Sequence, residues 1–163
     1  MDNKKIIVYA VIFIAIYFLV IKKIFNFLGL TKGEGTRKYD DAVASGNSPF
    51  NSSYWRNYLY SGNTPSNGRR PITQTLIDRM KKSAKEVYNS FGTFTDDEGR
   101  FMKALAMCKS KAEVSLMSFY FEQAHSDTLL SKMKYGAGSL PENGLSEGEL
   151  NNAFNFVNSL PTV

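Results

Sequence analysis

Sixteen residues without a charge, residues 6–21, constrain this chain more than any other feature. Their sequence, IIVYAVIFIAIYFLVI, would be apolar on every face of a helix, and burying such a helix takes a far larger protein around it. At about 1.5 Å per residue the run is roughly 24 Å long, against a hydrocarbon core of about 30 Å. The apolar pattern resumes after Lys22 and Lys23, whose ammonium groups can reach the lipid head groups. We therefore predict one transmembrane anchor within residues 1–30.

Two alternatives to a membrane anchor are a cleaved signal peptide and a buried core helix. The basic start, MDNKK, fits a signal peptide, but KKIFNF follows the apolar run and holds no small-x-small cleavage site. More Lys and Arg follow the run than precede it, which favours a C-terminal domain in the cytoplasm, or facing the shell if the membrane lies inside a virion. The side chains expected to meet the bilayer are Ile6, Tyr9, Phe13, Tyr17, Phe18, Lys22 and Lys23.

The net charge of +5 is unevenly distributed along the chain. Residues 1–73 carry +6, residues 74–134 carry +2, and residues 135–163 carry −3. The excess therefore lies beside the apolar run, where it would meet anionic head groups. A nucleic-acid-binding domain more often has a basic patch interleaved with aromatic residues, so no nucleic-acid partner is expected.

Residues 31–71 are rich in Gly, Ser, Asn and Pro, which predicts a linker with several turns. Aromatic residues at the density found here usually pack against something. They either dock on the helical domain of the same chain or form a contact surface for a partner protein. The candidates for partner contact are Phe50, Tyr54, Trp55, Tyr58 and Tyr60.

Residues 72–163 have the sequence pattern of an all-α domain of about five helices. The first helix follows Thr73, and its apolar residues recur at helical spacing from Leu76 to Phe91. Capping boxes at 95–98, 110–113 and 146–149 predict three further helix starts, because a Ser or Thr oxygen can accept from the third residue's N–H while Glu reaches back. Ser126 and Asp127 are expected to cap a short helix that runs through Met133.

The opposite side of the helix after Thr73 is basic. It is either a solvated face or a surface for anionic lipid. The lipid-facing candidates are Arg79, Lys82 and Lys85.

The search for catalytic chemistry finds little, and we expect no enzyme and no cofactor. His125 is the only histidine and Cys108 the only cysteine. Together they are too few for the usual zinc sites, and one cysteine excludes an internal disulfide. Cys108 follows an apolar helical pattern and is expected to be a buried thiol. A hydrolase that uses His125 is the enzyme alternative, without a substrate to propose for it.

The sequence FGTFTDDE at 91–98, after a long helix, resembles the start of an annexin repeat, and residues 76–160 match the helix lengths of one such repeat. Annexins bind anionic membranes through calcium, held by carbonyls of the first interhelical loop and a distant carboxylate. Here the loop has only Gly92-Thr93, and Lys134, Tyr135 and Gly136 stand where the carboxylate belongs. Calcium needs six to eight oxygen ligands, so the resemblance implies a fold and no calcium site.

The whole layout, an anchor, an aromatic-bearing linker and one helical module, is similar to small membrane proteins of bacteriophages of Bacteroidota hosts, including lipid-containing ones. The first functional hypothesis is therefore a single-pass structural or interaction protein whose partners are the bilayer and a coat or other membrane-associated protein. In a virion it would link the bilayer to the capsid shell. The alternative is a cellular membrane-surface module that binds anionic lipid through its basic face.

Overall fold

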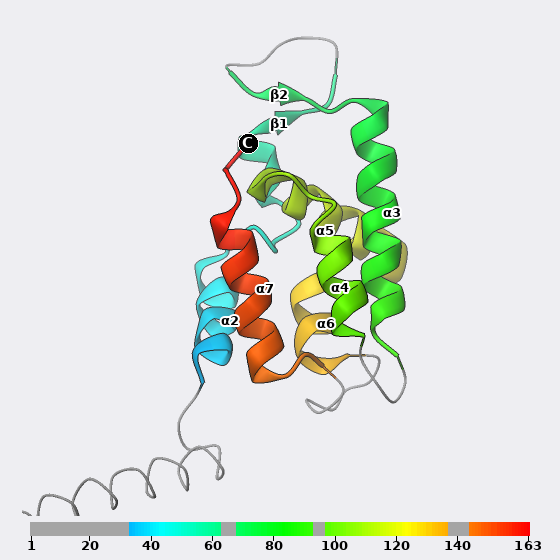
Figure 1. Cartoon of the computed structure of the whole chain (residues 1–163). Helices are drawn as coiled ribbons and strands as arrows, with labels where there is room; N and C mark the ends of the chain where they lie inside the picture. Colours follow the sequence, from blue (N-terminus) through cyan, green and yellow to red (C-terminus); the bar gives the residue numbers. More distant parts are fainter. Residues whose placement is uncertain (1–32, 63–67, 93–96, 137–143) are drawn as a thin grey trace, which may run out of the picture. The chain divides into compact units, whose positions relative to one another are not determined.

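A computed structural model describes residues 33–62, 68–92, 97–136 and 144–163 (Figure 1). Glu34–Val163 forms one compact unit. The predicted anchor, residues 1–30, and the seven side chains named for it lie outside the described residues. Within the described ranges, no helix is long and apolar enough to cross a membrane.

The described part of the chain is predominantly helical, which confirms the all-α expectation. Among the described residues, five α-helices follow residue 72, as predicted, and one further α-helix precedes it. The elements are α2 (Glu34–Ser45), the 3-10 helix η1 (Tyr54–Asn57), β1 (Leu59–Tyr60), β2 (Arg70–Pro71), α3 (Gln74–Ser90), α4 (Glu98–Leu105), α5 (Lys111–His125), α6 (Leu129–Tyr135) and α7 (Glu147–Ser159).

Helix α5 is the centre of the unit. Its residues 112–118 are all buried, so it has core contacts on every side rather than along one stripe. Around it lie fully buried side chains from the neighbouring elements, among them Phe50, Met80, Phe101, Leu129 and Met133. The other elements pack either on α5 or on the helices next to it.

Helix α3 covers one side of α5 and also packs on α4 (Figure 1). It begins where the Thr73 hydroxyl accepts a 3.2 Å hydrogen bond from the N–H of Leu76, a cap of the kind that stabilises a helix by about 1 kcal/mol. The apolar face predicted from its spacing is buried at Leu76, Met80, Ala84 and Val87. Tyr88, assigned to the same face, is instead 42% exposed.

Helices α2 and α7 pack side by side on the other flank (Figure 1). The structure corrects the expected boundary at residue 71, because the segment from Glu34 onward belongs to the compact unit. Tyr39 and Ala42 of α2 are buried, as are Phe50 and Leu59 further along. The Gly, Ser and Asn residues described in this segment lie mostly in turns between packed elements, so residues 34–62 and 68–71 of the expected linker belong to the compact unit.

The strand pair β1–β2 was not expected from the sequence. It is parallel, with Leu59 opposite Arg70 and Tyr60 opposite Pro71. The N–H of Arg70 donates to the Tyr58 carbonyl at 2.9 Å, and that of Ile72 donates to the Tyr60 carbonyl at 3.0 Å. Two residues per strand are too short for an alternating apolar pattern, so the sequence gives no signal for them.

The predicted helix starts are correct in part. At α7 the complete capping box forms between Ser146 and Glu149. At α5 Ser110 caps as predicted, but the Glu113 carboxylate accepts from the N–H of Lys109 at 2.7 Å instead of from its own cap residue. At α4 and α6 the caps are Asp97 and Thr128. Thr95 lies outside the described residues, and Ser126, predicted to open α6, ends α5 in a left-handed conformation with φ of 54°.

The C-terminal tail completes the start of the central helix. The carbonyls of Pro161 and Thr162 accept hydrogen bonds of 2.8 and 3.1 Å from the N–H groups of Lys111 and Ala112. The first N–H groups of any helix have no partner inside the helix. The last residues of the chain therefore satisfy two donors at the start of α5.

Candidate functional site

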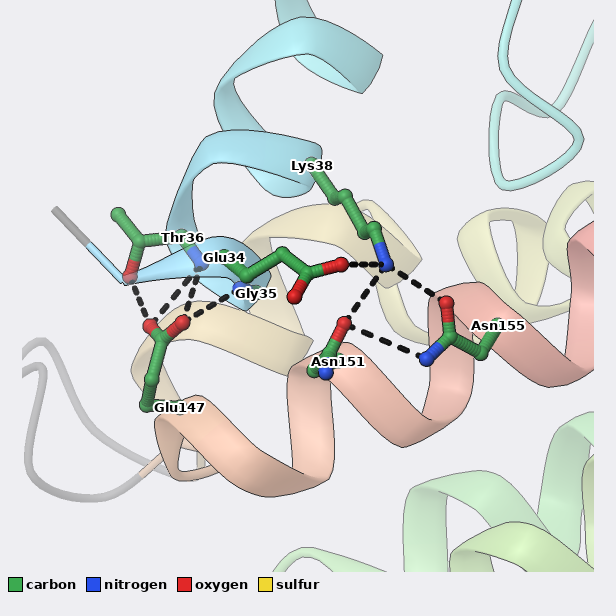
Figure 2. Close-up of polar contacts among 7 residues, drawn as sticks. All are labelled: Glu34, Gly35, Thr36, Lys38, Glu147, Asn151 and Asn155. Atoms are coloured by element: carbon green, nitrogen blue, oxygen red, sulfur yellow. Dashed lines mark hydrogen bonds and ion pairs between the residues drawn. The ribbon is translucent and has the colours of Figure 1, made fainter.

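A dense set of hydrogen bonds joins the first turns of α2 to helix α7 (Figure 2). Glu147, the first residue of α7, directs its carboxylate at the start of α2. It accepts from the N–H of Gly35, from the N–H of Thr36 at 3.0 Å and from the Thr36 hydroxyl at 2.6 Å. We call this set, together with Lys38 and its partners, the α2–α7 contact.

Glu147 caps α2 from a distant part of the sequence. A carboxylate at a helix N-terminus satisfies free N–H groups and interacts favourably with the helix dipole. Most helices obtain such a cap from the residue just before them, but here it comes from 112 residues later in the chain. The start of α2 is therefore held by α7, not by its own sequence.

Lys38 continues the same contact one turn further along α2 (Figure 2). Its ammonium group donates to the side-chain oxygens of Asn151 and Asn155 at 2.7 and 2.6 Å. It also pairs with Glu34 of its own helix at 2.7 Å. One cation thus joins two turns of α7 to the first turn of α2.

Gly35 allows the two helices to approach this closely. A Cβ atom at this position would lie 2.8 Å from the backbone nitrogen of Asn151 and 3.0 Å from the Cβ of Leu150, with the backbone oxygen of Glu147 closer still. Any larger residue must push α7 away from the start of α2. Gly35 and Glu147 were not among the predicted site residues, and no local pattern marks them because they lie so far apart in the chain.

The aromatic candidates for partner contact pack mainly on their own domain, which was the first of the two alternatives. Phe50 is 2% exposed, and its ring meets that of Phe154 edge-on at 5.0 Å. Tyr54 is buried and its ring lies 5.0 Å from that of Tyr58. Phe50 and Tyr54 are therefore unavailable to a partner, which corrects their assignment as contact residues; Tyr58 and Tyr60 are half-buried.

Trp55 is half-buried and is tied to the central helix. The backbone N–H of Trp55 donates to the hydroxyl of Ser115 at 2.9 Å, and that hydroxyl donates to the carbonyl of Asn51 at 2.5 Å. The Trp55 ring meets Phe119 edge-on at 5.7 Å. Ser115 therefore fixes the segment 51–55 on α5, and the aromatic residues around it serve as part of the core.

The three basic candidates on α3 differ in exposure and in their partners. Lys82 and Lys85 are exposed, as expected of lipid-facing candidates. Arg79 is not, because its guanidinium lies 2.7 Å from the carboxylate of Glu113, a side chain only 4% exposed. Arg79 balances a buried charge, which argues against its assignment as a lipid contact.

His125 and Cys108 both pack against side chains of α3. The imidazole of His125 stacks on the Tyr88 ring at 3.7 Å. Cys108 is 2% exposed with its Sγ 3.8 Å from the Sδ of Met80, and burial raises the pKa of the thiol to about 12. Among the described residues, no group of three or more His, Cys, Asp or Glu side chains is placed to hold a metal ion.

Comparison with known proteins adds no relative. No protein-family model matches the chain, and neither the curated proteins nor the solved structures contain a significant match. The likeness to an annexin repeat and to phage membrane proteins therefore stays a prediction from the sequence.

Proposed function

We propose that the chain is a single-pass membrane-anchored structural protein whose helical domain docks on another protein. One observation carries the proposal: a run of sixteen uncharged residues ends only a short distance before Glu34, where the folded unit begins. If residues 1–30 span a bilayer, three residues separate that span from α2. The α2–α7 contact then supports the proposal, because it ties the residues next to the anchor into the fold.

The surroundings of the candidate catalytic side chains favour docking over catalysis as the function of this domain. The histidine and the cysteine pack within or against the core, and the carboxylates of Glu113 and Glu147 are occupied by structural partners. The setting that we propose, from the resemblance in layout, is the membrane of a lipid-containing virion, where the domain would link the bilayer to the capsid shell. The excess of Lys and Arg after the apolar run supports a domain on the cytoplasmic or shell-facing side.

The anchor is tested by alkaline carbonate extraction of membranes that contain the full chain. We expect the protein to stay in the pellet, since an apolar run of this length is far more favourable in hydrocarbon than in water. A version that begins at Glu34 is the matched control and should move to the supernatant. Release of the full chain by carbonate would refute the proposal.

The virion setting has its own test. We expect the chain in purified particles together with a coat protein, and a cross-link between the two that detergent treatment of the bilayer does not abolish. Particles that lack the chain would remove the virion setting while leaving the anchor in place.

The alternative function is a module that binds anionic lipid. The exposure of Lys82 and Lys85 favours it. The ion pair between Arg79 and the buried Glu113 weakens the case for lipid binding, because one of the three proposed cations already has a partner. Hydrogen exchange of α3 in the reconstituted full chain separates the two functions. Protection of α3 in anionic but not zwitterionic bilayers, reversed by salt, would favour lipid binding.

A further inference from the structure

A groove of about 600 Å³ lies on the surface between α3 and α5, away from the α2–α7 contact. Both walls come from helices that are rigidly packed on each other, so the groove is part of the fold rather than a gap beside a loop. Its floor and walls hold Ala84, Tyr88, Tyr120, Ala124 and His125, and Lys81 and Lys85 lie at its edge. A volume of this size is typical of sites that bind part of a ligand or a few side chains.

The floor of the groove is aromatic and unusually exposed. Tyr88 is 42% exposed, although it lies on the helix that buries Leu76, Met80, Ala84 and Val87. Its ring is stacked on His125 with the two planes 5° apart, and it also lies near Phe121, a core side chain. Tyr88 and His125 are thus held against each other and against the core, while part of each side chain stays exposed at the surface. Rigid aromatic surfaces of this kind lose little entropy on binding and are common at the centre of protein interfaces.

Three lysines surround this floor. The ammonium group of Lys81 lies 5.4 Å from the ring centre of Tyr120, and that of Lys132, from α6, lies 5.6 Å from the ring centre of Tyr88. The third lysine, Lys85 on α3, is exposed and lines the groove. No Asp or Glu lines the groove, and within the described residues none of the three lysines forms an ion pair.

One negative charge, that of Asp78, acts on the Tyr120 end of the groove. Burial, and then the charge of Asp78, raises the pKa of the Tyr120 hydroxyl. The Asp78 carboxylate already accepts from the side-chain amide of Gln74 at 2.9 Å. The rest of the groove is therefore positively charged and is complementary to a partner with negative charge.

We infer that the α3–α5 groove is a docking site for an acidic segment of a partner protein that inserts apolar or aromatic side chains between Tyr88 and Tyr120. The inference rests on the proposed function and names the surface and the partner chemistry for it. An anionic lipid head group would be bound by the lysines alone and has no use for the stacked aromatic floor. A peptide segment uses both, with carboxylates at Lys81, Lys85 and Lys132 and side chains on the floor.

A displayed library of random 12-residue peptides tests the inference on the full chain in non-ionic detergent. We expect selection of peptides that combine Asp or Glu with Leu, Phe or Trp. Binding of a selected peptide should weaken at least tenfold in the double variant K81E/K85E, whose new charges repel it. The matched control K82E/K103E makes the same change of charge at two exposed positions that do not line the groove, and should bind within about twofold of the parent chain.

A second variant tests the floor without changing charge. Ala124→Gln places a longer, helix-compatible side chain in the groove, and we expect it to weaken peptide binding while the circular dichroism spectrum and thermal midpoint stay unchanged. Selection of peptides without acidic residues would overturn the inference. So would binding that K81E/K85E and Ala124→Gln leave intact.

Lipid binding at the same place is a separate outcome of this test. Soluble short-chain phosphatidylserine is added in place of the peptide, with the phosphatidylcholine of the same chain length as its control. Binding of the serine lipid that is lost in K81E/K85E, with no acidic peptides selected, would assign the groove to lipid and overturn the inference. Because detergent replaces the bilayer here, these results do not depend on the anchor, which carbonate extraction tests alone.

Discussion

The guanidinium of Arg79 on α3 lies 2.7 Å from the carboxylate of Glu113 on α5, and the glutamate side chain is almost completely buried. The same carboxylate accepts from the N–H of Lys109, so it has partners from both its own helix start and the neighbouring helix. A buried carboxylate without such partners is strongly unfavourable. The pair therefore fixes the position of α3 along α5, and with it the groove between them.

Replacing Arg79 with Met should destabilise the fold clearly. Breaking a buried ion pair costs about 3–5 kcal/mol, and because the Arg79 side chain is 29% exposed we expect about 2–3 kcal/mol. The thermal midpoint of the full chain in detergent, followed by near-ultraviolet circular dichroism, measures the loss. Arg100→Met breaks the more exposed pair with Glu86 and should change stability by less than about 1 kcal/mol. Equal shifts in the two variants would mean that burial of Glu113 contributes nothing.

Two glycines with contrasting surroundings, one crowded and one open, test the α2–α7 contact. Gly35→Ala should destabilise the fold by about 1–3 kcal/mol, because the new Cβ has no space against α7. Gly148→Ala, one residue after Glu147, meets no atom within 4 Å and should stabilise α7 by about 0.5–1 kcal/mol. Thermal unfolding measures both. A Gly35→Ala variant as stable as the parent would show that α2 does not lie this close to α7.

The stability of the unit should fall slightly with acidification through His125. Burial, and then the nearby charge of Lys132, lowers the pKa of His125 below its usual value of 6.5 in the folded chain. The unfolded chain then binds the proton more readily, so this contribution decreases as the pH falls from about 7 toward the folded pKa. Nuclear magnetic resonance titration of the single imidazole should give a pKa below 6.5, and Lys132→Gln should raise it. A pKa at or above 6.5 in the parent would contradict the stacked, half-buried position.

Cys108 should be inert in the folded protein. With a pKa of about 12 and 2% exposure, almost none of the thiol is ionised or accessible at pH 8. A maleimide reagent should leave the native chain unlabelled and label it fully in guanidinium chloride, and the count is simple because the sequence has one cysteine. Rapid labelling of the native chain would require local opening between Met80 and Cys108.

The sequence predicted what local patterns encode. The apolar spacing of α3 and the Ser146–Glu149 box at α7 are signals within one helix, and both are confirmed. The turn-rich composition of 31–71 concealed α2, since its stability comes from α7 rather than from its own residues. The basic spacing on α3 gave no sign that Arg79 faces a buried partner. Contacts across more than a hundred residues leave no periodic trace, so Glu147 and Gly35 were found only in the structure.

The position of the α2 cap has a consequence for synthesis. Ribosomes add about 5–20 residues per second, so the 112 residues from Gly35 to Glu147 take roughly 6 to 22 s to make. Throughout that interval the start of α2 lacks both its cap from Glu147 and the surface of α7. The docking of α2 on α7 must therefore follow synthesis of nearly the whole polypeptide, as must the capping of α5 by the Pro161 and Thr162 carbonyls.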